Sequence, residues 1–214
     1  MLKLSPHYRM DNNEGLPVEV QKYLDEHFLA HLPHLQKVHP KLLIVFSGGS
    51  AVGKSSLSHF LQSELKALVL ENDAIKLLLQ KMNPHISQDE LNRYTWQYTM
   101  NLYQHLAEIS PNGLVVRDGV IDWYYDRILP TFIAQGYELF IIAYDLTHEK
   151  RVELIKKRGD MPNSTVERFI ELLEDHEIHI KRFRSNYSPD VLLNDHNLFD
   201  FAPIAQQIRA RLKQ

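Results

Sequence analysis

Five short apolar runs alternate along the chain with longer stretches in which apolar residues recur every three or four positions. The runs are typical of core strands, and the expected strands cover residues 42–46, 67–73, 113–119, 137–145 and 190–195. Two parallel strands need a long connection between them, which is usually a helix. The alternation therefore predicts an α/β fold with a five-stranded parallel sheet.

The stretches between these runs predict the helices. They cover residues 17–36, 53–65, 87–109, 122–135 and 148–158, one from the polar break at 158–164 to about 183, and one from about 203. Pro17 suits the first turn of the first helix and Pro33 lies close to its end. We therefore expect a helical extension over residues 1–40 and one α/β domain over residues 41–214.

The segment FSGGSAVGKSS joins the first strand to the next helix and fits the pattern G-x-x-x-x-G-K-[ST]. Small residues let successive backbone N–H groups wrap a phosphate, and the helix N-terminus adds the positive end of its dipole. Lys54 would neutralise the β- and γ-phosphates and Ser55 would bind Mg²⁺; the alternative is a fortuitous glycine-rich turn. The expected nucleotide-binding residues are Gly48, Gly49, Ser50, Ala51, Val52, Gly53, Lys54, Ser55 and Ser56.

Acidic residues end several of the expected strands, at the edge of a parallel sheet where ligands bind. Asp118 ends the third strand, where a carboxylate can hold the Mg²⁺ shell opposite Ser55. Its alternative role is to cap a helix or a turn. Asp145 ends the fourth strand and competes for the metal role, but the following LTHEK sequence is typical of helix capping. Asp118 is therefore the preferred metal ligand.

Two further residues are candidates for the chemistry of phosphoryl transfer. Asp73 follows the second strand, and its carboxylate can accept the proton of an attacking hydroxyl. Arg158 ends a basic helix, and its guanidinium can stabilise the transferred phosphoryl group from a lid of about residues 158–165. The alternatives are a helix cap for Asp73 and a solvated helix-end cation for Arg158.

The region around the third strand also predicts a substrate-binding surface. Arg117 is a charge within a core strand, so it needs a partner, and Asp73 or a substrate phosphate are the candidates. Trp123 and Tyr124 follow this strand closely enough to line an acceptor pocket. Packing between helices is the default explanation for such an aromatic cluster.

Other polar patterns have simpler explanations. Histidines in segments 27–34 and 175–180 lie near metal-ligand spacing, but without a third set of ligands a packed or solvated helix is favoured. Arg151 is expected to be an ordinary surface cation.

Composition restricts the classes of partner. The net charge of −3 argues against broad affinity for nucleic acids or membranes, which leaves nucleic acid only as a substrate for end phosphorylation. The chain has no cysteine, so disulfides and thiolate metal sites are excluded. The N-terminal residues lack an apolar core of the kind found in signal peptides. We therefore expect a soluble, cytoplasmic protein; its oligomeric state cannot be inferred.

With these residues placed, the chain resembles the P-loop kinases of the zeta-toxin and polynucleotide-kinase branch over roughly residues 40–195. The resemblance rests on GGSAVGKSS, VLENDAIK, LVVRDG, AQGYELFIIAYD and LIKKRGD, in that order. It implies a three-layer, nucleoside-kinase-like fold with a short lid, ATP and Mg²⁺ as the phosphoryl donor, and a hydroxyl-bearing acceptor. It also implies that Asp73 activates the acceptor hydroxyl and that Arg158 contacts the donor phosphates.

The chain departs from this family pattern at one position and leaves the acceptor open. Relatives often carry a second lid arginine where this chain has Leu154, and Arg168 or Arg151 could substitute for it. The acceptor could be a nucleotide sugar, a polynucleotide end or another small alcohol. The rival hypothesis is an ATP-binding or ATP-hydrolysing regulatory or toxin-like protein without small-molecule kinase activity.

Overall fold

The computed structural model describes residues 15–32, 41–106, 113–160 and 165–213. The chain forms two compact units. One contains residues 1–34 and 71–109, and the other contains residues 35–70 and 110–214. The units are interleaved along the chain, and the expected division after residue 40 remains a prediction.

The larger unit is built on a sheet with the strand order β2-β3-β1-β4-β5, which confirms the expected five-stranded parallel sheet. All six residues of the central strand β1 are buried, which explains why it reads as a continuous apolar run. In register, Leu42 of β1 lies beside Leu114 on one side and Glu138 on the other. The strands are β1 (Leu42–Ser47), β2 (Leu68–Glu71), β3 (Leu114–Val120), β4 (Glu138–Tyr144) and β5 (Val191–Leu193).

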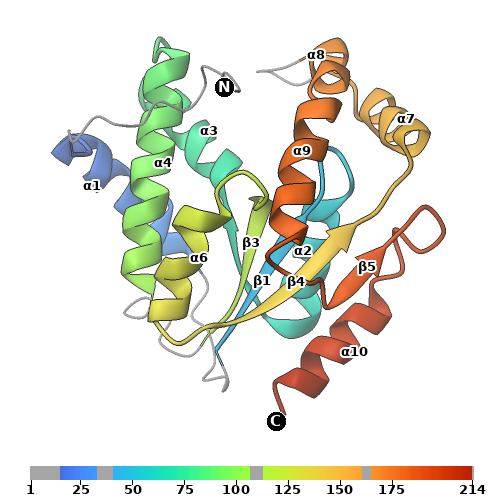
Figure 1. Cartoon of the computed structure of the whole chain (residues 1–214). Coiled ribbons are helices and arrows are strands. Elements are labelled where there is room, and N and C mark those ends of the chain that lie inside the picture. Colours follow the sequence, from blue (N-terminus) through green and yellow to red (C-terminus); the bar gives the residue numbers. More distant parts are fainter. Residues whose placement is uncertain (1–14, 33–40, 107–112, 161–164, 214) are drawn as a thin grey trace. The chain divides into compact units, whose positions relative to one another are not determined.

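Helices cover both faces of this sheet, so the unit has three layers. Figure 1 shows α6 (Tyr125–Ala134) and α9 (Leu173–Arg184) in front of the sheet and α2 (Lys54–Leu65) behind it. Helix α10 (Ala202–Arg211) contacts α2. Leu42, Ile44 and Phe46 pack in one core cluster with apolar residues of α2 and α10. Side chains alternate along a strand, so Leu43 and Val45 face the other layer.

The smaller unit is helical. It contains α1 (Val18–His27), the 3₁₀ turn η2 (Leu29–His31), α3 (Asn72–Met82) and α4 (Gln88–Gln104). Ser87 begins α4 with a capping box, in which its hydroxyl accepts from the Glu90 N–H and the Glu90 carboxylate accepts from the Ser87 N–H. The Tyr98 hydroxyl of α4 donates to Asp25 of α1 at 3.0 Å. Contacts of α3 with both other helices complete this unit.

Several element boundaries differ from the expected ones. The second strand ends at Glu71 and α3 begins at Asn72, so Asp73 lies in the first helical turn instead of ending the strand. The helix expected up to about residue 183 is broken at Leu172 into α8 (Val166–Glu171) and α9, whereas α7 (His148–Arg158) has the expected bounds. The first helix ends at His27, nine residues early, and 33–36 of its expected range lie outside the described residues.

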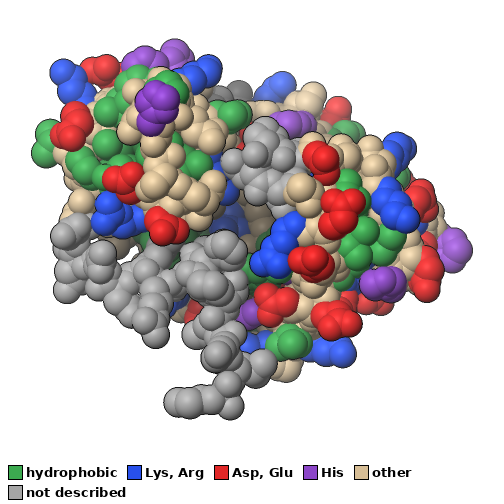
Figure 2. Space-filling model, turned by 90° about the horizontal axis from the view of Figure 1, so that it is seen from above, with side chains coloured by type: hydrophobic (Ala, Val, Ile, Leu, Met, Phe, Trp, Pro, Cys, Tyr) green, Lys and Arg blue, Asp and Glu red, His purple; other side chains and the backbone are tan. Residues whose placement is uncertain are grey.

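The surface of the described residues agrees with the modest net charge. Acidic and basic side chains are interspersed on the face in Figure 2. Among the described helices, none is both long enough and apolar enough to cross a membrane.

Candidate functional site

The phosphate loop follows β1 with a backbone that few residue types can adopt. Gly48 has φ 139° and Gly53 has φ 93°, both in the region that favours glycine. Ala51 also has a positive φ of 63°, which is uncommon for a residue with a side chain. Gly53 is the N-cap of α2, and among the described residues no side-chain capping hydrogen bond is made to the first N–H groups of this helix. These N–H groups are available to an anion.

Neighbouring residues approach the loop closely at its first two glycines. A Cβ on Gly48 would lie 2.8 Å from the Cβ of Tyr144 at the end of β4. A Cβ on Gly49 would lie 3.1 Å from Nδ1 of His176 on α9. Gly48 is therefore required by packing as well as by backbone conformation, whereas Gly49 is favoured by the close approach of His176 alone.

Lys54 begins α2 and turns its amine back into the loop. Its side chain is buried, and its ammonium group donates to the carbonyl oxygen of Gly49. Burial lowers the pKa of Lys54 to about 8. An ammonium group in this position is a cation held inside the loop, where the phosphates of a nucleotide would bind.

Four charged side chains influence the pKa of Lys54. Asp118 and Asp122 stabilise its charged form, while Arg158 and Arg117 oppose it. The structure therefore brings five charged side chains together at the loop. Four of them were expected site residues: Lys54, Asp118, Arg158 and Arg117. The fifth is Asp122.

Asp122 is a residue of the site that the sequence analysis missed. It lies two residues after β3, is buried, and accepts a hydrogen bond from the Gly48 N–H at 2.8 Å. Burial raises its pKa, while the Ser47 hydroxyl, the Gly48 N–H and Lys54 act in the opposite direction. Its only sequence signal was a second acid shortly after a strand that had already provided Asp118.

Ser55 and Asp118 supply the oxygen atoms expected to bind Mg²⁺. Ser55 is exposed in the first turn of α2, and Asp118 lies half-buried near the end of β3. Among the described residues, no group of three or more His, Asp or Glu side chains could hold a metal ion alone. A hydroxyl and one carboxylate fit a magnesium ion that takes its remaining ligands from a nucleotide and water. The competing Asp145 instead forms an ion pair with Arg184 at 3.0 Å.

The arginines of α7 differ in environment. Arg158 is exposed at the end of the helix, with its guanidinium 5.8 Å from the ring centre of Phe169 on α8. Arg151 is not the surface cation that the sequence suggested, because it is buried and pairs with Glu177 of α9. Arg168 is exposed and pairs with Glu171. Residues 161–164 of the expected lid lie outside the described residues.

Arg117 and Asp73 have local partners. Nη1 of Arg117 donates to the Val120 carbonyl at 3.1 Å. Asp73 belongs to the smaller unit, where its exposed carboxylate lies 3.5 Å from the ammonium group of Lys76. The proposed link between Asp73 and an acceptor hydroxyl therefore remains a prediction.

Solved structures resemble the chain, although no protein-family model and no curated protein matches its sequence. A proposed kinase from Chloroflexus aurantiacus has 21% identity and a TM-score of 0.58, covering 80% of this chain and 98% of its own. A chain from the PezAT chromosomal toxin–antitoxin system of Streptococcus pneumoniae has 11% identity and a TM-score of 0.57, and the match covers 96% of this chain and 99% of that one. A gluconokinase from Sinorhizobium meliloti has 20% identity and a TM-score of 0.52, and the match covers 83% of this chain and 95% of that one.

The chain has the fold of P-loop kinases. Within this kinase fold, Trp123 and Tyr124 lie between β3 and α6, close in sequence to the charged cluster. The Trp123 ring packs against His176 and His179 of α9, with ring centres 5.1 and 5.2 Å apart. Both aromatic residues are half-buried, so their expected contribution to an acceptor pocket stays a prediction.

An exposed aromatic ring lies beside Gly53, at the end of the loop. Phe199 follows β5 and is 60% exposed, although its Cε1 atom would lie only 3.3 Å from a Cβ on Gly53. An apolar ring left in solvent beside a phosphate loop is suited to stacking on a nucleobase. The sequence analysis missed this residue, because a phenylalanine in a loop carries no motif.

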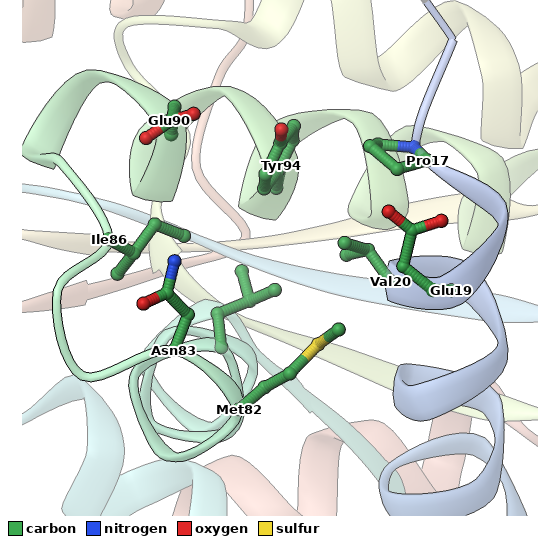
Figure 3. A pocket seen from close by; sticks show the side chains of 9 residues that line it. Pro17, Glu19, Val20, Met82, Asn83, Ile86, Glu90 and Tyr94 are labelled. Atoms are coloured by element: carbon green, nitrogen blue, oxygen red, sulfur yellow. The ribbon is translucent and has the colours of Figure 1, made fainter.

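The smaller unit contains a cavity of about 180 Å³. Figure 3 shows Glu90 and Tyr94 of α4 on one side of it and Met82 and Asn83 at the end of α3 on the other, with Glu19 of α1 at one end. Its lining contains two carboxylates, Glu19 and Glu90, and no lysine or arginine. Electrostatic repulsion therefore disfavours a phosphate group in this cavity.

Proposed function

We propose that the chain is an ATP-dependent phosphotransferase that moves the γ-phosphoryl group of ATP to a hydroxyl acceptor. The observation that carries this proposal is the buried ammonium group of Lys54 inside a glycine loop, surrounded by two carboxylates and two guanidinium groups. Phosphoryl transfer needs little covalent chemistry from a protein, but it needs cations and N–H donors in fixed positions. The loop and its charges supply these groups.

The donor site uses different groups for different parts of the nucleotide. The N–H groups of the loop and Lys54 bind the phosphates, and Phe199 offers a ring to the base. Ser55 and Asp118 would hold Mg²⁺, which neutralises charge on the phosphates when it is bound. Arg158 would stabilise the transferred group from the end of α7. An ATP-dependent reaction of this kind is suited to the cytoplasm.

On the acceptor side, the proposal assigns Asp73 as the group that receives the hydroxyl proton. The acceptor oxygen forms a bond to the γ-phosphorus while the bond from this phosphorus to the bridging oxygen of ATP breaks, which leaves ADP. A carboxylate that accepts a hydrogen bond from the hydroxyl can take its proton as the new bond forms. Arg117, Trp123 and Tyr124 are the proposed acceptor contacts. Nucleotide sugars, polynucleotide ends and other small alcohols are the candidate substrates.

The rival function is a regulatory or toxin-like protein that binds or hydrolyses ATP without a small-molecule acceptor. It would use the same loop, Lys54 and metal ligands, so these residues do not separate the two functions. The presence of Arg158 beside the charged cluster disfavours a protein that only binds ATP, because passive binding has no need to stabilise a transferred group. Transfer to an acceptor and hydrolysis by water are separated by the product that is formed.

An acceptor screen tests the proposed function. The protein is incubated with ATP labelled on the γ-phosphate, Mg²⁺, a metabolite extract and a set of oligonucleotides with free 5′-hydroxyl ends. Mass spectrometry should find a new phosphomonoester that the Lys54→Met variant does not form. ATP binding with only free phosphate as product would support the rival function, and the absence of ATP binding would contradict both.

A further inference from the structure

His176 occupies an unusual position for a polar side chain. It lies on the buried face of α9, at the spacing that Leu173, Ile180 and Phe183 share, and its side chain is 4% exposed. The Trp123 ring meets it edge-on. Such a face normally holds apolar residues, so a buried imidazole there needs hydrogen-bond partners.

The Nδ1 atom of this imidazole faces the phosphate loop. It is the atom that a Cβ on Gly49 would approach to 3.1 Å, so the ring lies close to the loop at a position that has no side chain. Within the described part of the chain, Nδ1 has no hydrogen-bond partner. A buried polar atom without a described partner therefore lies beside Gly49 of the phosphate loop.

The chemical state of His176 suits a hydrogen bond to an anion. Burial lowers its pKa to about 4, and the charges of Lys54, Arg151 and His179 act in the same direction, against Asp175. The ring is therefore neutral near pH 7, and one of its nitrogens carries a proton. A neutral donor can hold a phosphate oxygen without adding another cation beside Lys54.

We propose that His176 is a further nucleotide-contacting residue, whose Nδ1–H donates to a polyphosphate oxygen in the loop while Gly49 leaves room for the ring. This inference rests on the proposed function, because the partner of Nδ1 arrives with the nucleotide. The ligand class is any polyphosphate that the loop accepts, whatever acceptor the protein uses.

Three variants separate this role from a packing role. His176→Leu keeps an apolar side chain in the core and removes the donor, whereas His176→Asn places an amide nitrogen about where Nδ1 lies. His179→Leu is the matched control, because His179 also contacts Trp123 from α9. Calorimetry in the presence of Mg²⁺ uses ATP and inorganic tripolyphosphate as probes. His176→Leu should weaken both affinities about tenfold or more, while the other two variants stay within about threefold of the wild type.

The outcomes distinguish this inference from the proposed function. If the wild-type chain binds both probes and folded His176→Leu binds them equally well, His176 is only a packing residue and this inference fails alone. If the wild-type chain binds neither probe, the proposed function fails and this inference fails with it.

An NMR measurement of the protonation of Nδ1 tests the role of His176 even if His176→Leu does not fold. Wild-type protein is labelled with ¹⁵N in its histidine rings, and the spectrum of His176→Asn identifies the His176 signals. In the ATP complex, Nδ1 of His176 should carry a proton. A complex in which Nδ1 is unprotonated would overturn the proposal, because it could not donate to a phosphate oxygen.

Discussion

The backbone N–H of Gly48 donates to the buried carboxylate of Asp122 at 2.8 Å. This bond joins the start of the phosphate loop to the segment that follows β3, across 74 positions of the sequence. The same carboxylate stabilises the charged form of Lys54. One side chain therefore connects the shape of the loop with the charge of the cation inside it.

Replacing Asp122 should reduce stability through this bond. Asp122→Ala leaves the Gly48 N–H without its acceptor in a buried position, so the free energy of unfolding should fall by about 2 kcal/mol. Asp122→Asn keeps an acceptor oxygen and should cost about half as much. Urea denaturation measures both values. Asp126→Ala, at an exposed position on α6, is the control, and an equal effect of all three substitutions would contradict the role of Asp122.

The affinity for ATP should depend on pH through Lys54. Its pKa in the free protein is about 8, and bound phosphates favour the charged form, so the pKa must be higher in the complex. Affinity should therefore fall by about twofold between pH 7 and pH 8 and by up to about tenfold per pH unit above pH 8. The titration of ATP itself should not change the affinity in this range, because the terminal phosphate loses its last proton near pH ~6.

Calorimetry with ATP and Mg²⁺ from pH 7 to pH 10 measures this dependence. Lys54→Arg is the control, because a guanidinium group stays charged over the whole range. Whatever the absolute affinity of this variant for ATP, that affinity should show no change near pH 8. A wild-type affinity that stays constant to pH 9.5 would show that Lys54 is already fully charged in the free protein.

The sequence predicted what depends on local pattern. The strands and α7 could be predicted because apolar runs and helical spacing indicate burial directly. The phosphate loop could be predicted because its glycines and lysine lie within eight residues. The burial of Arg151 could not be predicted, because α7 is rich in charge and its partner Glu177 lies 26 positions away on α9. The proximity of His176 to Gly49 could not be predicted from the sequence for the same reason. Such contacts depend on how distant helices pack.

Phe199 should contribute to the affinity for the base and not for the phosphates. Phe199→Ala removes a ring that is 60% exposed, so the melting temperature should change little. Loss of stacking should weaken ATP binding about tenfold and leave tripolyphosphate binding unchanged. Phe199→Trp, which restores an aromatic face, should recover the affinity. Equal affinities of the alanine variant and the wild type for ATP would place the base elsewhere.

Arg158 should act on turnover more than on binding. If its guanidinium stabilises the transferred phosphoryl group, Arg158→Ala should lower the rate of transfer by about a hundredfold or more and change ATP affinity only slightly. Single-turnover kinetics and calorimetry separate the two quantities. Lys157→Ala is the control, because Lys157 is the preceding exposed cation on α7. Wild-type turnover in Arg158→Ala would identify Arg158 as a helix-end cation.

Asp73 provides the test that separates a kinase from a passive ATP-binding protein. An acceptor alcohol holds its proton at neutral pH, so a carboxylate that accepts this proton should contribute about 10²–10⁴-fold to the rate. Asp73→Asn keeps the shape of the side chain but cannot accept the proton. Because Asp73 is exposed in the first turn of α3, the substitution should preserve the melting temperature and ATP affinity while transfer to the acceptor collapses. Asp89→Asn, at an exposed position in the first turn of α4, controls for the loss of a carboxylate near a helix N-terminus. Transfer at the wild-type rate by Asp73→Asn would reduce Asp73 to a helix-stabilising residue and would require another base in the mechanism.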